Sequence, residues 1–446
     1  MRRSFVFLLR PTSKQAAALT RCLEDHRQLY NAALEHRRTA YAKAGVTIRY
    51  GEQSAELKEI RRADPDGQGR WSAGSQQQTL RRLDRAFTAF FRRVKAGRKA
   101  GYPRFKGRGR FDTVEWPAVK NGATWDSQPH EPATRVYLLG IGHVRVHQHR
   151  AVKGRVKTIS VKREASRWYV VLSCADVPAQ TLPATGAVAG IDMGVASLVT
   201  TSDGEHVANP RYSAATADRL AAAQRDLARK KRGSKRRRKA VARVAALHDK
   251  VRRQRLDGVH KAALRLVRRY DVIVHEALNV AGMTRRVTPK PDGDGGYLPN
   301  GGSAKSGLNR SIRDAGWGVF LAILSHKAES AGRELIAVNP ANTSRTCARC
   351  EHVAKENRLT QAEFRCMACG HAAHADVNAA ENILRAGLAL REAAGAAWRE
   401  AAPFKERRSH HCSFSPSEAS RPRIQSTSAA MPAARSGGAS GSTAQV

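Results

Sequence analysis

The chain has 446 residues, with 79 Lys or Arg against 38 Asp or Glu, so its formal net charge is +41. A charge this large repels itself unless a polyanion neutralises it, and a nucleic acid is therefore the expected partner. A membrane protein is disfavoured, because no apolar run is long enough to cross a bilayer. The seven cysteines do not form a disulfide framework, which favours a reducing compartment. We expect a bacterial cytoplasmic, nucleoid-associated protein.

The first hundred residues predict one strand and two long helices. The apolar run at residues 4–9 is too short for a signal peptide and is predicted to be a β-strand. Thr12 and Gln15 form a capping-box pattern that opens a helix to about residue 42. A second helix, at about 75–95, has one apolar and one arginine-rich face, and a basic segment containing aromatic residues follows it. Our candidates for nucleic-acid contacts here are Arg81, Arg85, Arg92, Arg93, Tyr102, Arg104, Phe105 and Lys106.

The middle of the chain predicts two kinds of sheet. Residues 136–175 alternate apolar and polar with period two, which indicates antiparallel strands. From residue 187 a buried strand, a turn and two further strands follow. Lys or Arg then occupy nine of residues 229–239, on a predicted helix. Such a run is usually a solvated face, but in a chain this basic a nucleic-acid contact is favoured. The candidates are Arg236, Arg237 and Arg238.

The last third of the chain alternates strands and helices before its composition changes. A buried strand ends at Glu276, and residues 288–307 are predicted to be a loop because they are rich in Gly and Pro. A single amphipathic helix is expected over 309–330, followed by a strand at about 334–340. Residues 396–446 are rich in Ser, Ala, Pro and Gly, which predicts a disordered tail.

Two Cys-x-x-Cys pairs with 15 residues between them predict a metal site. Four thiolates at this spacing fit a closed, tetrahedral, structural zinc site, and Fe–S ligation is the minor alternative. The predicted ligands are Cys347, Cys350, Cys366 and Cys369. His352, His371 and His374 could replace a cysteine but are interpreted as surface residues, and of the leftover Cys22, Cys174 and Cys412 the first two are interpreted as core residues.

Three carboxylates end elements that are otherwise apolar. Asp192 and Glu276 each close a buried strand, and Asp376 lies in the first turn of an Ala-rich helix, seven residues after the last cysteine. A buried carboxylate is costly unless it is paired or binds a metal. Together the three could bind two Mg2+ ions that cleave a phosphodiester. Taken singly, Asp376 could be a helix cap and Glu276 could pair with an arginine, while Asp192 is harder to explain without a metal.

At these residues the sequence resembles the TnpB family, transposon-encoded RNA-guided nucleases related to compact type V CRISPR effectors. The resemblance covers residues 1 to about 386. It rests on "GIDMGVASLVTTSDG", "HEALNVAGM", "NPANTSRTCARC", "FRCMACG" and "HADVNAAENI", with "GYPRFKGRGRF" upstream. The sequence departs from the family pattern at Ala277, Arg345 and His374, and none of these changes removes one of the three acids.

The resemblance implies an α/β and β multidomain chain. A wedge-like β-barrel (1–12 and 110–180) would be interrupted by a helical recognition module (13–109). An RNase H-like RuvC nuclease (181–346 and 371–395) would carry an inserted zinc ribbon (347–370). The implied catalytic residues are Asp192, Glu276 and Asp376, and the implied partners are a guide RNA and double-stranded target DNA. No membrane and no obligate protein partner are expected.

The resulting functional hypothesis is an Mg2+-dependent, RNA-guided DNA endonuclease encoded by a transposable element. Three rivals stay open at this point. A nuclease-inactive RNA-guided repressor would bind DNA without cutting it, and a transposase would join strands with the same two-metal site. The third, a guide-free structure-selective nuclease, is disfavoured by the large basic N-terminal half.

Overall fold

The computed structural model describes residues 1–117, 121–126 and 134–401. Residues 1–392 form one compact unit, and of the second unit, 393–446, only the end of helix α10 (Ala375–Ala401) is described. The tail prediction for 402–446, together with Cys412, lies outside the described residues. Helix α10 continues past residue 396, where the tail was expected to begin.

The first sheet has seven antiparallel strands in the order β2-β6-β7-β1-β5-β4-β3. The strands are β1 (Arg3–Arg10), β2 (Thr113–Trp116), β3 (Ala123–Asp126), β4 (Arg135–Leu138), β5 (Gly142–His147), β6 (Arg155–Glu164) and β7 (Arg167–Ala175). Strand β1 lies in the middle, although a hundred residues separate it from β2. The order is open, because β2 and β3 stand at its ends, so closure into the expected barrel stays a prediction.

Helices occupy the segment between β1 and β2. They are α1 (Ser13–Ala44), α2 (Tyr50–Ala55), α3 (Leu57–Ala63) and α4 (Ala73–Lys95), with a 3-10 turn at Gln68–Arg70. The predicted capping box is confirmed, since the side chain of Thr12 accepts from the N–H of Gln15 and that of Gln15 accepts from Thr12. Cys22 and Cys174 are buried, as expected. This module and the first sheet share one apolar core.

The second sheet has five strands in the order β10-β9-β8-β11-β14. They are β8 (Val188–Asp192), β9 (Ser197–Thr201), β10 (His206–Ala208), β11 (Val272–Glu276) and β14 (Glu334–Val338). Strands β8, β11 and β14 are mutually parallel, while β9 and β10 run antiparallel to their neighbours. Strand β8 is therefore central, because β11, which follows the helical crossover, pairs with its free edge.

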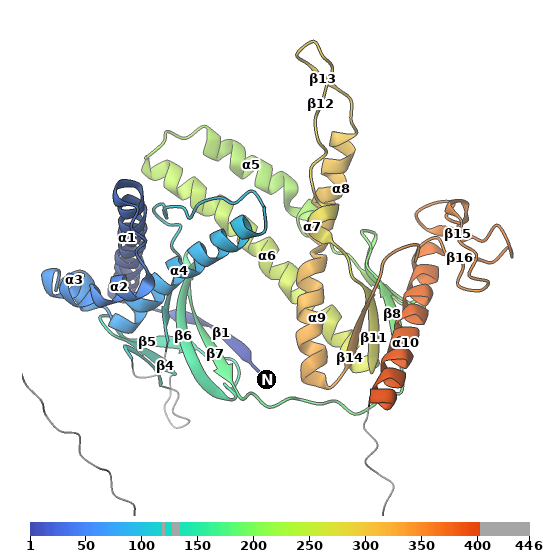
Figure 1. The fold of residues 1–446 in the computed structure, drawn as a ribbon, viewed down its shortest axis with the longest axis horizontal. Coiled ribbons are helices and arrows are strands. Elements are labelled where there is room, and N and C mark those ends of the chain that lie inside the picture. Colours follow the sequence, from blue (N-terminus) through green and yellow to red (C-terminus); the bar gives the residue numbers. More distant parts are fainter. Residues whose placement is uncertain (118–120, 127–133, 402–446) are drawn as a thin grey trace, which may run out of the picture. The chain divides into compact units, whose positions relative to one another are not determined.

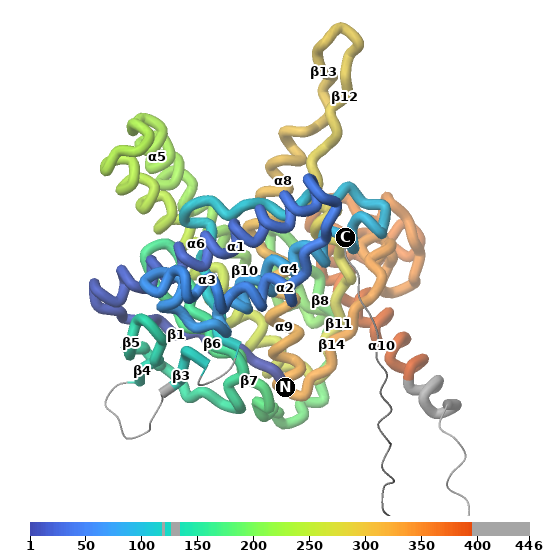
Figure 2. The backbone as a smooth tube through the Cα atoms, turned by 60° about the vertical axis from the view of Figure 1, so that its left-hand side comes forward, coloured from blue at the N-terminus to red at the C-terminus, as the bar shows by residue number. Residues whose placement is uncertain are grey.

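Helices cover both faces of this sheet (Figures 1 and 2). On one face α6 (Lys235–Arg269) and α9 (Trp317–Ala331) share a core with Ala189, Ile191 and Ile273. On the other face α10 packs on Val272 and Val274 through Ile383. Adjacent strand residues point to opposite faces, so a strand buried on both faces reads as a continuous apolar run.

Two local predictions were wrong. The helix expected over 309–330 is two helices, α8 (Gly302–Ala315) and α9, because Gly316 adopts a left-handed conformation with φ of 73° and ends the first. The loop expected at 288–307 contains a short hairpin, β12 (Lys290–Pro291) with β13 (Tyr297–Leu298), and the start of α8. Glycine in these places sets the turn rather than preventing structure.

The basic run at 229–239 spans the turn between α5 (Ala217–Ala228) and α6. A 3-10 turn at Ala214–Thr216 precedes α5, and a short helix, α7 (Val280–Met283), follows β11. In the described ranges we find no helix that combines the length and the apolar character needed to cross a bilayer.

Candidate active site and metal centre

Asp192 and Glu276 lie at the same edge of the second sheet. Strand β11 pairs in parallel with β8 up to His275 opposite Ile191, and each strand has one further residue, Glu276 and Asp192. The carboxyl ends of parallel neighbours meet at one edge, which is where open α/β sheets bind ligands. The topology, rather than the spacing in sequence, brings these two acids together.

Asp376 is brought to this edge by helix α10. A Cβ atom on Gly190 of β8 would lie 2.0 Å from the carbonyl oxygen of Ala380, and one on Gly387 of α10 would lie 2.3 Å from Val274. These two glycines therefore allow helix and strands to approach closely. In the first turn of α10, Oδ2 of Asp376 lies 3.8 Å from the place where a Cβ on Gly194 would stand. Asp376 is thus close to the turn that follows Asp192, and only 8 % of its surface is exposed.

The electrostatics show that the other two carboxylates act on Asp192. The pKa of Asp192 rises from 3.8 to about 7, because burial, then Glu276 and then Asp376 oppose its ionisation. Burial also raises the pKa of Glu276, against a hydrogen bond from Thr343 that lowers it. Mutual repulsion of this kind marks a site that gains from a bound cation. We call Asp192, Glu276 and Asp376 the carboxylate site.

Two neighbours of the carboxylate site were not foreseen from the sequence. Arg358 donates to Oδ1 of Asp376 over 3.3 Å and lowers the pKa of Asp192. The hydroxyl of Thr343 donates to Glu276. Both come from the segment around the cysteines. The motif "NPANTSRTC" contains Thr343, but nothing in its pattern indicated a partner for a distant glutamate.

The four predicted cysteines converge. Their Sγ atoms all lie within 4.8 Å of one another, with 3.7 Å between Cys347 and Cys369 and 3.5 Å between Cys350 and Cys366. Tetrahedral coordination with metal–sulfur bonds of about 2.3 Å puts sulfurs about 3.8 Å apart, so the donor set fits one metal ion. Within the described ranges, this cysteine cluster is the one group of three or more His, Cys, Asp or Glu that meets this distance limit, and the carboxylate site does not.

Two similar backbone turns shape the cysteine cluster. The N–H of Glu351 donates to the carbonyl of Cys347, and that of Gly370 donates to the carbonyl of Cys366. Both donors have a positive φ, 61° at Glu351 and 71° at Gly370. The carbonyls of His352 and His371 accept from the N–H groups of Cys347 and Cys366, the first cysteine of each pair, so these histidines contribute their backbone to the turns.

The segment that carries the cysteines is attached directly to the start of α10. Its small hairpin, β15 (Glu363–Arg365) with β16 (Ala372–His374), runs into the helix without a linker. Ala375 is buried with Cys347 and Cys366 and donates to the carbonyl of Ala362. The buried Asn378 binds the backbone of Thr346 and Ala348. The cysteine cluster therefore fixes the residues on both sides of Asp376.

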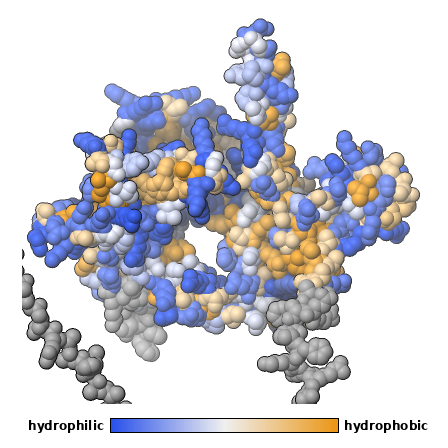
Figure 3. All heavy atoms as spheres, viewed as in Figure 1, coloured by the Kyte–Doolittle hydropathy of each residue, from blue (hydrophilic) through white to orange (hydrophobic). Residues whose placement is uncertain are grey.

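Most candidate nucleic-acid contacts are exposed, and hydrophilic residues cover much of the face of the molecule seen in Figure 3. The exposed ones are Arg81, Arg85, Arg92, Arg93, Tyr102, Arg104, Phe105, Arg236 and Arg238. The other two candidates, Lys106 and Arg237, are only partly exposed and have internal contacts. Lys106 lies over the ring of Tyr30, and Arg237 donates to the carbonyls of Leu227 and Lys230 at the end of α5. Whether any of these residues binds nucleic acid stays a prediction.

The described residues thus form a mixed α/β protein with acids at one sheet edge, a third acid on the covering helix and a candidate four-cysteine metal centre. Family models match at three places: "Probable transposase" (OrfB_IS605) at 159–287, "Cas12f1-like, TNB domain" at 317–383 and "Helix-turn-helix domain" at 1–45. The chain belongs to the TnpB family, as two long alignments with relatives show.

The two relatives are "Putative RNA-guided DNA endonuclease InsQ" of Escherichia coli (strain K12) and a "Putative RNA-guided DNA endonuclease" of Streptomyces pristinaespiralis. The first is 33% identical over 87% of this chain and 92% of its own, and the second is 35% identical over 87% and 90%. A solved Cas12f1–sgRNA–target DNA complex has a similar fold, with a TM-score of 0.51, 15% identity and coverage of 83% of each chain.

Proposed function

We propose that this protein is an RNA-guided DNA endonuclease whose nuclease domain has the RNase H-like fold. The observation that carries the proposal is the set of three acids gathered at one sheet edge, in a chain whose relatives are named for this activity. The second sheet supports the RNase H-like fold. In chain order its strands are arranged 3-2-1-4-5, and β8, β11 and β14 are parallel. The net charge of +41 supports RNA and DNA as partners.

The carboxylate site would hold two Mg2+ ions, which supply Lewis-acid stabilisation of the charge that develops on the cleaved phosphodiester. The fit rests on the donor set, since all donors are carboxylate oxygens, and a nearby cation would favour the ionised forms of Asp192 and Glu276, whose pKa values are raised. Thr343 holds the carboxylate of Glu276, and Arg358 lies beside Asp376. Burial of Asp376 and the half-buried positions of the other two acids limit the access of water.

The cysteine cluster would bind one structural Zn2+. Four thiolates leave no open coordination position, so this ion would not take part in cleavage. Its effect would pass through the backbone, because Ala375 packs among the cysteines and is followed by Asp376. In this proposal the zinc positions the third acid of the carboxylate site.

The guide would be read by base pairing, while the protein holds the backbone of RNA and DNA. The test is to purify the full chain with the RNA that accompanies it, sequence that RNA, and offer matching double-stranded DNA with Mg2+. We expect cuts in matched DNA, none in mismatched DNA, and none with Asp192→Ala, which should keep its affinity for nucleic acid. Wild-type cutting by Asp192→Ala would refute the site.

The description "Probable transposase" of the matched family model keeps one rival in view. The same assay distinguishes the proposed endonuclease from a transposase and from a repressor. Joined strands made from element ends without a guide would establish a transposase, whereas binding of matched DNA without any product would establish a repressor.

A further inference from the structure

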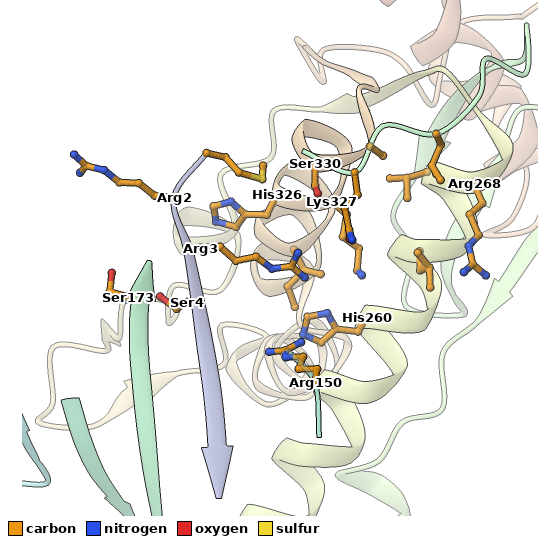
Figure 4. Close-up of a pocket in the computed structure, with 17 residues that line it drawn as sticks. Arg2, Arg3, Ser4, Arg150, Ser173, His260, Arg268, His326, Lys327 and Ser330 are labelled. Atoms are coloured by element: carbon orange, nitrogen blue, oxygen red, sulfur yellow. The ribbon is translucent and has the colours of Figure 1, made fainter. Parts of the chain in front are cut away.

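A cavity of about 590 Å³ lies where the start of β1 meets helices α6 and α9 (Figure 4). Its walls come from residues 1–4, from Ser173 of β7, from Arg150 in the loop between β5 and β6, and from both helices. The surrounding backbone is tied together, since the N–H of Gln180 donates to the carbonyl of Ser330 over 2.8 Å and that of Leu182 to Ala331 over 3.0 Å. We call this space the basic cavity. It is separate from the carboxylate site and from the cysteine cluster.

The lining of the basic cavity carries many cations and no carboxylate. Its basic residues are Arg2, Arg3, Arg150, His260, Arg268, His326 and Lys327. Within the part of the chain that the structure describes, none of the arginines or the lysine forms an ion pair. The carboxylates closest in sequence have their own contacts, Asp257 with Lys261 at 2.8 Å and Glu329 with His326 at 4.0 Å.

Several of these cations are held toward one space. In Figure 4, Arg3, Arg150 and His260 point toward one another, Lys327 reaches the same space from α9, and Arg2 points away. The guanidinium groups of Arg3 and Arg150 both lie over the ring of the buried Phe5, at 5.7 Å and 5.4 Å from its centre. A side chain stacked in this way loses little conformational freedom when it binds an anion.

The cations repel one another across the basic cavity. Burial and then Arg3, Arg268 and Arg150 lower the pKa of Lys327, and burial followed by Arg3 lowers the pKa of Arg150. Burial, Lys327 and Arg150 likewise lower the pKa of His260. An anion with two or more negative charges would relieve this repulsion.

We propose that the basic cavity binds a phosphate group, supplied either by the backbone of RNA or by a free phosphate anion. Convergent guanidinium and ammonium donors are the groups that recognise phosphate, and the volume admits a phosphate or a diphosphate. The RNA source rests on the proposed function, whereas phosphate binding itself does not. Because the walls belong both to the first sheet and to helices of the second, a bound phosphate stabilises the packing between them.

The first test uses the full chain freed of RNA and inorganic pyrophosphate as the probe. We expect pyrophosphate to raise Tm by roughly 2 °C or more over chloride at equal ionic strength. The double variant Arg150→Gln/Lys327→Gln should lose this rise, while its Tm without pyrophosphate should equal or exceed that of the wild type, because like charges are removed. A merely structural role of the pair would instead lower that Tm.

The matched control is Arg145→Gln/Lys157→Gln, an arginine and a lysine that are exposed on the first sheet and do not line the cavity. It should keep the full pyrophosphate response. Absence of the rise in the wild type, or an equal rise in the cavity variant, overturns the proposal whatever the outcome of any cleavage assay.

The second test identifies the source by repeating the measurement on the RNA-bound protein. If an RNA phosphate fills the basic cavity, pyrophosphate no longer raises Tm, and the cavity variant shows a flatter salt dependence of RNA affinity than the control variant. If the source is a free anion, pyrophosphate raises Tm of the RNA-bound protein as well, and the two variants show the same salt dependence.

Discussion

The cysteine cluster and the carboxylate site differ in how the chain builds them. The four cysteines lie within 23 consecutive residues, 347–369, and two local turns bring their sulfurs within 4.8 Å. The three acids lie at 192, 276 and 376, and they meet only because β8, β11 and α10 pack together. A local site can form before the rest of the fold, whereas the carboxylate site depends on every contact between these elements.

The two sites are nevertheless connected through the start of helix α10. The cysteine cluster shares its small core with Ala375, and Asp376 follows. A substitution in the cysteine cluster should therefore also disturb the carboxylate site. A substitution at the sheet edge should leave the cysteine cluster intact. The predictions below test this asymmetry.

The largest effect is expected from Cys366→Ser. Structural zinc sites contribute much of the folding energy of small modules, so loss of one thiolate should abolish zinc retention and loosen the start of α10. Cleavage should fall about 10²-fold or more, because misplacement of a reacting group by about 1 Å has effects of that size. Zinc content by elemental analysis and cleavage rate on the same sample are the measurements.

Cys174→Ser is the control for the loss of a thiol alone. Cys174 is buried in the other sheet, so its variant should keep zinc and cleavage even if stability drops. Full cleavage by zinc-free Cys366→Ser would show that the cysteine cluster does not position Asp376.

The next effect separates packing from metal binding. Gly190→Ala places a Cβ 2.0 Å from the carbonyl oxygen of Ala380, which is backbone and cannot move aside without shifting α10. We expect a loss of about 1–3 kcal/mol in the free energy of unfolding and a fall in cleavage of about tenfold or more, with zinc content unchanged. Denaturant unfolding, cleavage rate and zinc analysis measure the three quantities.

Gly318→Ala is the matched control, because a Cβ at this position in α9 meets nothing within 4 Å. It should raise the free energy of unfolding by about 0.5–1 kcal/mol, through lower entropy of the unfolded chain, and leave cleavage unchanged. If both glycine variants cut like the wild type, close packing of α10 is not what positions Asp376.

A third prediction concerns the cost of ionising Asp192. Its pKa in the folded chain, about 7, lies above the ordinary 3.8, so the folded protein retains a proton that the unfolded chain releases. The contribution of protonated Asp192 to the free energy of unfolding is complete below about pH 4 and is lost as the pH rises through about 7. In EDTA at pH 8, Asp192→Asn should therefore be more stable than the wild type, by about 1–3 kcal/mol, and the difference should shrink toward pH 4.

The variant Asp66→Asn, at an exposed acid, controls for the loss of one negative charge and should show little difference at either pH. Mg2+ should reduce the advantage of Asp192→Asn, because only the wild type keeps the complete carboxylate site. An advantage that is equal at pH 5 and pH 8 would show that ionisation of Asp192 is not its source.

The same contrast explains what the sequence could predict. The spacing of the cysteines and the ends of the strands at Asp192 and Glu276 are local signals, and the structure has them where they were expected. The contacts of Thr343 and Arg358 join residues from different elements, and no periodicity encodes them. Gly190 was visible, but its purpose is apparent only when the backbone of α10 lies against it. The break at Gly316 was missed because apolar spacing continues across it.

The smallest effect is expected at the contact between the two sites. Arg358, from the cysteine segment, lies 3.3 Å from Asp376 and is a positive charge where the carboxylate site would take Mg2+. Arg358→Gln should therefore lower the half-saturating Mg2+ concentration about threefold, equivalent to the roughly 0.7 kcal/mol of a partly exposed ion pair. A titration of Tm against Mg2+ on the RNA-free chain measures this without any cleavage.

Arg349→Gln, at an exposed arginine of the same segment, controls for the general loss of positive charge and should shift the midpoint less. An equal shift in both variants would mean that Arg358 acts only through net charge. A higher midpoint for Arg358→Gln would reverse the interpretation, because it would show that the ion pair keeps Asp376 in position for the metal. In that case the cysteine segment would support the carboxylate site through a side chain as well as through its backbone.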